Sequence, residues 1–177
     1  MVRLIQALML VLISGLMLVG CGSTDPLELV KTGTLEFDNS VTVGDAFDGY
    51  KYIKNPTWTT FQTDQGRTIV QMSAGVDPKD YSGTMIPGVW EIDDQTAAYL
   101  NKNGKFTYKV QFAVGKDGKT FSVHFVGIDA KFSALETKEI PDEKLETVQA
   151  AYNNQHSETM KAAFFVITSA LVQKGVE

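Results

Sequence analysis

The fold is decided by the stretch Lys105-Phe106-Thr107-Tyr108-Lys109-Val110-Gln111-Phe112-Ala113-Val114. Apolar and polar side chains alternate along it, which is typical of a β-strand with one buried face. Gly115-Lys116-Asp117-Gly118 then predicts a turn, and the apolar pattern resumes on a return strand at Phe121, Val123 and Phe125. The sequence therefore predicts an antiparallel hairpin whose apolar face covers a core while its polar face meets solvent.

The segment before this hairpin predicts a helix followed by another hairpin. Thr42 is the predicted N-cap of a helix over residues 43–54, with Asp45 as its capping partner and Asn55-Pro56 as its end. Residues 57–63 and 68–76 read as strands joined by the turn Asp64-Gln65-Gly66-Arg67.

The segment after residue 128 predicts helices. Pro141, followed by two acidic residues, suits the first turn of a helix. Residues 160–172 are apolar nearly all round, which indicates a buried helix that is too short to cross a membrane. The predicted fold class is α+β, with a four-stranded antiparallel meander at about residues 57–128 covered on one face by the N-terminal helix and the C-terminal helices.

The two hairpins are separated by a segment without a clear period. Gly83, Pro87 and Gly88 interrupt the apolar residues of the span 77–103. We therefore expect residues 41–177 to form a single α+β domain with an irregular insertion at about 77–103.

The N-terminal segment resembles a lipoprotein signal. An apolar run follows Arg3 and closes on Leu18-Val19-Gly20-Cys21, which resembles the lipobox of bacterial lipoproteins. In that family the cysteine thiol is alkylated with diacylglycerol and the chain is cut before it. The resemblance implies a signal peptide at 1–20, a lipidated tether at 21–40 and attachment to the membrane through lipid on Cys21. The alternative is a buried cysteine at the end of a transmembrane helix, but the run is short of the roughly 20 residues needed.

The residue after Cys21 bears on the location. In lipoproteins sorted as in enterobacteria, an aspartate at that place retains the protein at the inner membrane, and here it is Gly22. The resemblance thus favours the outer membrane, facing the periplasm, over the inner membrane.

The charge of the chain argues against two classes of function. The sequence has 16 basic and 21 acidic residues, and removal of residues 1–20 takes away Arg3 alone, which leaves 15 against 21, or a charge of −6. This balance argues against binding of nucleic acid and against electrostatic docking on an anionic membrane face, so the lipid would make the attachment.

Several motifs of the central region resemble those of a family of small uncharacterised domains in bacterial lipoproteins and other cell-envelope proteins. They are Thr42-Val43-Gly44-Asp45-Ala46-Phe47, Trp58 with Phe61, Gly66-Arg67 and Ile69-Val70. The resemblance covers residues 41–128 and implies a fold, without an active site that could be transferred.

Candidate catalytic and ligating residues have simpler structural interpretations. His124 is expected to face solvent from a strand, and His156 to lie in a polar turn; their spacing matches no zinc motif. Asp93 and Asp94, near Glu91, are expected at a helix N-terminus rather than in a calcium or catalytic site. We therefore expect no metal, no cofactor and no enzyme activity.

Two tryptophans could instead mark binding surfaces. Trp58 is expected to pack in the core, whereas Trp90 lies in the irregular span. The candidate partner surface comprises Tyr81, Met85, Ile86 and Trp90.

Three function hypotheses follow. The first is a non-enzymatic, lipid-anchored envelope protein that binds or scaffolds another envelope protein. The second is a binder of a small apolar or sugar ligand between sheet and helices. The third is a hydrolase that uses Asp93 or Asp94 with His124, which would need these groups within hydrogen-bond reach.

Overall fold

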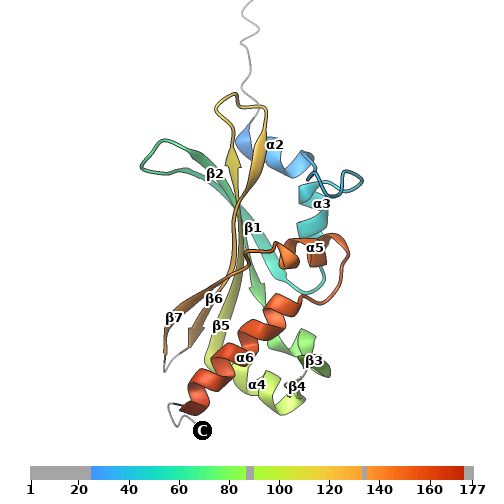
Figure 1. Cartoon of the computed structure of the whole chain (residues 1–177), viewed down its shortest axis with the longest axis vertical. Helices are drawn as coiled ribbons and strands as arrows, with labels where there is room; N and C mark the ends of the chain where they lie inside the picture. The colour runs from blue at the N-terminus through green and yellow to red at the C-terminus, as the bar shows by residue number, and fades with distance from the viewer. Residues whose placement is uncertain (1–24, 87–89, 133–134, 174–177) are drawn as a thin grey trace, which may run out of the picture.

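The protein folds around a five-stranded antiparallel sheet. The computed structural model describes residues 25–86, 90–132 and 135–173. The strands lie in the order β1-β2-β5-β6-β7 (Figure 1), so that each strand pairs with the next one of the sheet along the chain. Their bounds are β1 Lys54–Gln62, β2 Thr68–Val76, β5 Gly104–Val114, β6 Phe121–Phe132 and β7 Leu135–Pro141.

Strand β5 is the centre of the sheet, as its alternating sequence predicts. It pairs with β2 on one side and with β6 on the other. Its apolar side chains at Phe106, Tyr108, Val110 and Phe112 are buried. The α+β class and both predicted hairpins are therefore confirmed.

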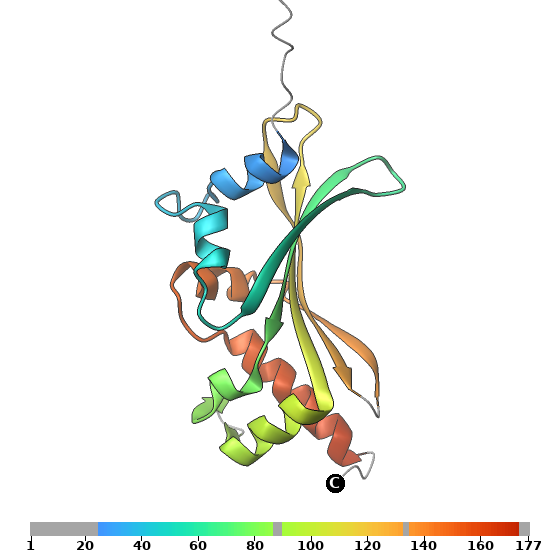
Figure 2. The ribbon, with the colours of Figure 1, turned by 180° about the vertical axis from the view of Figure 1, so that it is seen from behind.

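Helices pack against the sheet (Figure 2). They are α2 Pro26–Thr32, α3 Val43–Asp48, α5 Glu146–Tyr152 and α6 Glu158–Gln173. Thr42 caps α3 as expected, because its hydroxyl oxygen accepts from the Asp45 amide at 3.1 Å and its hydroxyl donates to the Asp45 carboxylate at 2.8 Å. The helix is shorter than the predicted 43–54 and ends at Asp48, with Gly49 as its C-cap, yet Tyr50 and Ile53 beyond it are still buried.

The sheet has one strand more than the predicted meander of four. Strand β7 pairs with the C-terminal half of β6 and places Pro141 opposite Gly127. Pro141 therefore ends a strand and does not open a helix. An edge strand tolerates proline and charged side chains such as Lys138 and Glu139. The polar sequence of β7 therefore does not indicate a strand.

The span expected to be a tether is folded from Pro26 onward. Asp25 caps α2 by accepting the Leu27 amide at 3.0 Å, and Val30 is fully buried in the core. Helix α2 contacts β1, β2, β5 and α3. The described part of the span 21–40, from residue 25 onward, thus belongs to the domain.

The span 77–103 forms ordered elements at one end of the sheet. These are a 3₁₀ helix η1 Pro78–Tyr81, strands β3 Thr84–Ile86 and β4 Trp90–Ile92, and helix α4 Asp94–Asn103. Strands β3 and β4 form a separate two-stranded ribbon, which we call the distal ribbon. Figures 1 and 2 place this ribbon and α4 at the end of the molecule opposite to α2.

Helix α6 is buried on one face only. Met160, Ala163, Phe164, Ile167 and Leu171 lie in the core, whereas Val166 is 42% exposed. The predicted packing of this helix against the sheet is therefore confirmed for this face, whereas its other face, with Val166, has no layer above it among the described elements.

Candidate functional site

The candidate partner surface is divided by the structure. Met85 on β3 is 55% exposed, the largest value among the exposed large apolar side chains of the described residues. Tyr81 is fully buried and belongs to the core, so its assignment to a surface is wrong. Ile86 and Trp90 face each other across the distal ribbon, but their side chains lie outside the described residues.

Tyr81 joins the span 77–103 to α6. Its hydroxyl donates to the Met160 sulfur at 2.8 Å, and its ring meets that of Phe164 edge to face at 5.3 Å. Burial raises the pKa of Tyr81 far above its ordinary value, so the hydroxyl stays protonated and can donate. An aromatic side chain of this size stabilises a core by about 1.5–3 kcal/mol, which fixes η1 in place.

The distal ribbon is held by two more contacts. Ile92 on β4 is fully buried, and the Lys161 ammonium on α6 donates to the Met85 carbonyl oxygen at 3.2 Å. Lys161 also forms an ion pair with Glu158 on its own helix. Met85 is therefore presented to solvent by a backbone that is tied to the core.

His156 contacts neighbouring elements of the fold, whereas His124 is exposed on a strand. His156 Nε2 lies 2.9 Å from the Asp80 carbonyl oxygen, and its ring lies against that of Tyr52 at 4.0 Å between centroids. His124 is exposed at a bulge of β6, where the register with β5 shifts between Gln111 and Phe112.

The structure does not bring His124 and the acidic cluster together. Asp93 caps α4 by accepting the Thr96 amide at 2.7 Å, and α4 leads into β5 at Gly104. At about 3.4 Å per residue, the β5 position opposite His124 lies roughly 24 Å from Gly104. These contacts therefore give no support to the hydrolase hypothesis.

Trp58 is partly buried and packs against the core, in the direction expected. Its ring lies 6.3 Å from both Phe47 and Phe112, and its indole nitrogen donates to Asp48 at 2.8 Å. Lys31 of α2 forms an ion pair with the same carboxylate at 2.7 Å and lies 5.3 Å above the tryptophan ring. This group of side chains fastens α2 to α3 and β1.

The space between sheet and helices is filled by side chains. Fully buried aromatic residues from α3, η1, β5 and α6 occupy it, and they are Phe47, Tyr81, Tyr108, Phe112 and Phe164. This packing gives no support to a ligand site under the sheet.

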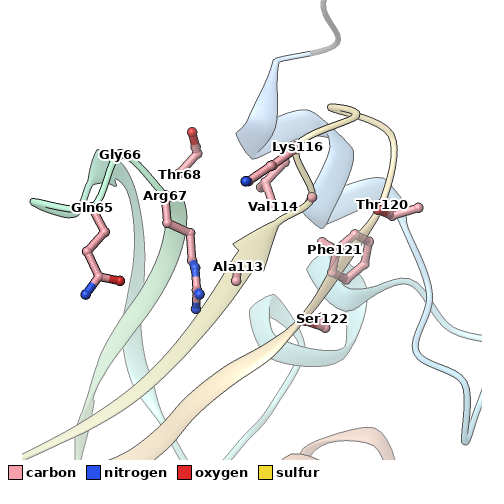
Figure 3. A pocket seen from close by; sticks show the side chains of 11 residues that line it. Gln65, Gly66, Arg67, Thr68, Ala113, Val114, Lys116, Thr120, Phe121 and Ser122 are labelled. Carbon is pink, nitrogen blue, oxygen red and sulfur yellow. The ribbon is translucent and has the colours of Figure 1, made fainter.

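A cleft that sequence reasoning missed lies between the tips of the two hairpins. We call it the hairpin cleft; it measures about 970 Å³. Figure 3 shows the Arg67 side chain extending into it and the Lys116 ammonium turned toward the β1–β2 hairpin. The turns around Gly66 and Gly118 were recognisable in the sequence, but only the pairing of β2 with β5 brings them to the same end. The cleft is lined by Gln65, Gly66, Arg67, Thr68, Ala113, Val114, Gly115, Lys116, Thr120, Phe121 and Ser122.

Among the described residues, no group of three or more His, Cys, Asp or Glu side chains is placed to hold a metal ion. In the same part of the chain, no helix has both the length and the hydropathy to cross a membrane.

The chain was also compared with known proteins. Comparison with protein-family models, with curated proteins and with solved structures found no match. Cys21 lies outside the described residues, so its assignment stays a prediction from the sequence.

Proposed function

We propose that the protein is a non-enzymatic lipoprotein of the cell envelope, anchored through Cys21, that binds or scaffolds another envelope protein. The anchor is supported by the lipobox-like stretch Leu18-Val19-Gly20-Cys21. Gly22 after the cysteine favours the periplasmic face of the outer membrane. Attachment of two or three acyl chains gives stable anchoring, at about 0.8 kcal/mol per buried CH₂.

One observation supports the partner surface above all. Met85 is an exposed apolar side chain on an ordered ribbon whose neighbours Tyr81 and Ile92 are fully buried. Methionine is adaptable and is enriched at protein interfaces. The ribbon lies at the end of the domain opposite to α2, where the chain leaves toward Cys21 (Figure 1). A lipid-anchored domain would thus hold Met85 away from its own bilayer and toward a partner.

The alternative function is binding of a small apolar or sugar ligand between sheet and helices. It is less well supported, because packed aromatic side chains fill that space.

The partner hypothesis is tested by a pull-down after chemical crosslinking of intact envelopes. The wild type is expected to recover a discrete partner. The Met85→Glu variant should recover at least about tenfold less of that partner, because it places a charge in an apolar contact. Met85→Leu is the matched control, since it keeps an apolar side chain of similar volume, and it should retain the partner.

Both variants should fold normally, because Met85 is exposed and surface substitutions change stability by about 0.5 kcal/mol or less. Equal recovery with Glu and with Leu at position 85 would exclude the distal ribbon as the binding surface. The anchor is tested separately by palmitate labelling, which Cys21→Ser should abolish.

A further inference from the structure

The hairpin cleft combines basic side chains with hydroxyl groups. Arg67 comes from the β1–β2 turn and Lys116 from the β5–β6 turn, and both side chains are exposed. Within the described parts of the chain, neither of them forms an ion pair. The polar lining also includes the Gln65 amide and the hydroxyl groups of Thr68, Thr120 and Ser122, of which the Thr120 hydroxyl donates to Asp117.

The acidic residue of the β5–β6 turn is occupied within the turn itself. The Asp117 carboxylate accepts from the amides of Lys119 and Thr120 at 3.0 and 3.2 Å, and from the Thr120 hydroxyl at 3.0 Å. These bonds lower the pKa of Asp117, with the Lys119 amide as the largest cause. The carboxylate is thus held by its own turn, and the cleft keeps the cationic groups Arg67 and Lys116.

The cleft lies at the same end of the molecule as the start of α2. Figures 1 and 2 show the β5–β6 turn beside the beginning of α2, and the β1–β2 turn at the same end. Only three residues, Gly22 to Thr24, lie between Cys21 and Asp25, the N-cap of α2, so the distance along the chain is four residue steps. Four extended residues span at most about 14 Å, so a lipid on Cys21 would bring this end of the domain to the headgroup region.

We propose that the hairpin cleft binds the phosphate group of an anionic phospholipid in the bilayer that holds Cys21. This inference rests on the anchoring proposed above. The Arg67 guanidinium presents paired donors that match phosphate oxygens, and Lys116 adds a compact positive charge. The exposed Phe61 pairs with Ile69, which in turn pairs with the cleft residue Ala113, so Phe61 lies on the same face of the sheet as Ala113.

Binding of a headgroup in the cleft fixes the orientation of the domain on the bilayer, whereas the acyl chains on Cys21 supply the attachment. The charge of −6 weakens the attraction of the mature chain to an anionic surface, and each basic residue at the surface contributes only about 1 kcal/mol, so the cleft by itself binds weakly and vesicles in excess are needed to detect it. Once the acyl chains hold the domain, the local concentration of headgroups is high and weak binding is sufficient. The hairpin tips then face the bilayer, and the distal ribbon points away from it.

The test uses residues 22–177 without lipid, a chain that contains every described residue and hence the complete core. Binding is measured by flotation with vesicles of phosphatidylcholine, with and without phosphatidylglycerol. The wild type is expected to bind only the anionic vesicles. The double variant Arg67→Gln, Lys116→Gln should have a partition coefficient at least about tenfold lower. Lys79→Gln combined with Lys138→Gln is the matched control, because it removes the same charge from exposed positions outside the cleft and should leave binding unchanged.

Equal loss for both double variants, or no binding of the wild type to anionic vesicles, would overturn the proposal. Saturable binding of inorganic phosphate in the cleft without a preference for anionic vesicles would also overturn it, because it would assign the site to a soluble phosphate. Since this chain lacks Cys21, the result is independent of lipidation. Failure of the anchor would appear in palmitate labelling alone.

Discussion

Tyr50 and Tyr108 lie in the same core but differ in how their hydroxyl groups are placed. Tyr50 donates to the Gln155 carbonyl oxygen at 2.8 Å, which ties the end of α3 to the turn after α5. Tyr108 is fully buried, and within the described residues its hydroxyl forms no hydrogen bond of normal geometry. Burial raises the pKa of Tyr108 well above its usual value, with a smaller opposite effect from the nearby Thr147 hydroxyl.

The same substitution should therefore have different effects at these two residues. Tyr50→Phe removes a hydrogen bond and leaves a carbonyl oxygen unpaired, so it should lower the free energy of unfolding by about 1 kcal/mol. Tyr108→Phe removes a poorly satisfied hydroxyl and should change it by less than about 0.5 kcal/mol, or raise it. Urea unfolding at neutral pH measures both. A larger loss at Tyr108 than at Tyr50 would contradict the assignment of these contacts.

At the scale of the element, α2 decides how the domain sits relative to Cys21. Val30→Ala should lower the free energy of unfolding by about 2 kcal/mol, because this side chain is fully buried between α2 and the sheet. Glu28→Ala on the exposed face of the same helix is the control and should change it little. Unfolding followed by tryptophan fluorescence compares the two variants. A negligible effect of Val30→Ala would mean that α2 is part of a tether after all.

How far the elements could be predicted depends on where their signals lie in the sequence. Strand β5 was predictable because its pattern is strict, and α3 because Thr42 and Asp45 are local capping residues. Strand β7 was not, since an edge strand pairs through its backbone and its charged side chains carry no apolar period. Helix α2 was missed for a similar reason, because Val30 shows its role only once the sheet exists.

The candidate sites, too, could be predicted only where their signals are local in the sequence. Met85 could be suggested from an apolar residue in an irregular span, but the burial of Tyr81 depends on its contact with α6, almost 80 positions later in the chain. Glu146 is another example, because its carboxylate accepts from the Ser157 hydroxyl and from the amides of Glu158 and Thr159 at the start of α6. The hairpin cleft exists only through the register of two hairpins that are distant in the sequence.

At the scale of the whole molecule, buried tyrosines set the response to alkaline pH. Burial raises the pKa values of Tyr50, Tyr81 and Tyr108 in the folded state, whereas an unfolded tyrosine titrates near pH 10. Above about pH 10 the unfolded state therefore binds fewer protons than the folded state, and stability falls as pH rises, by up to about 1.4 kcal/mol per pH unit for each such tyrosine. Below that pH these tyrosines contribute no pH dependence.

Urea unfolding between neutral pH and about pH 11 checks this. The slope above pH 10 should be shallower for Tyr108→Phe than for the wild type, which separates the tyrosine contribution from that of lysines. An unchanged slope in the variant would contradict the burial of an ionisable Tyr108.

The two ends of the molecule carry the central claim, which is that one end faces the bilayer while the other meets a partner. The most direct measurement introduces a photoactivatable residue at Gln65 or at Met85 of the full-length protein in intact cells. We expect phospholipid adducts from position 65, and a discrete protein adduct from position 85 that is lost when Cys21→Ser is added. Protein adducts from position 65 together with lipid adducts from position 85 would contradict the central claim.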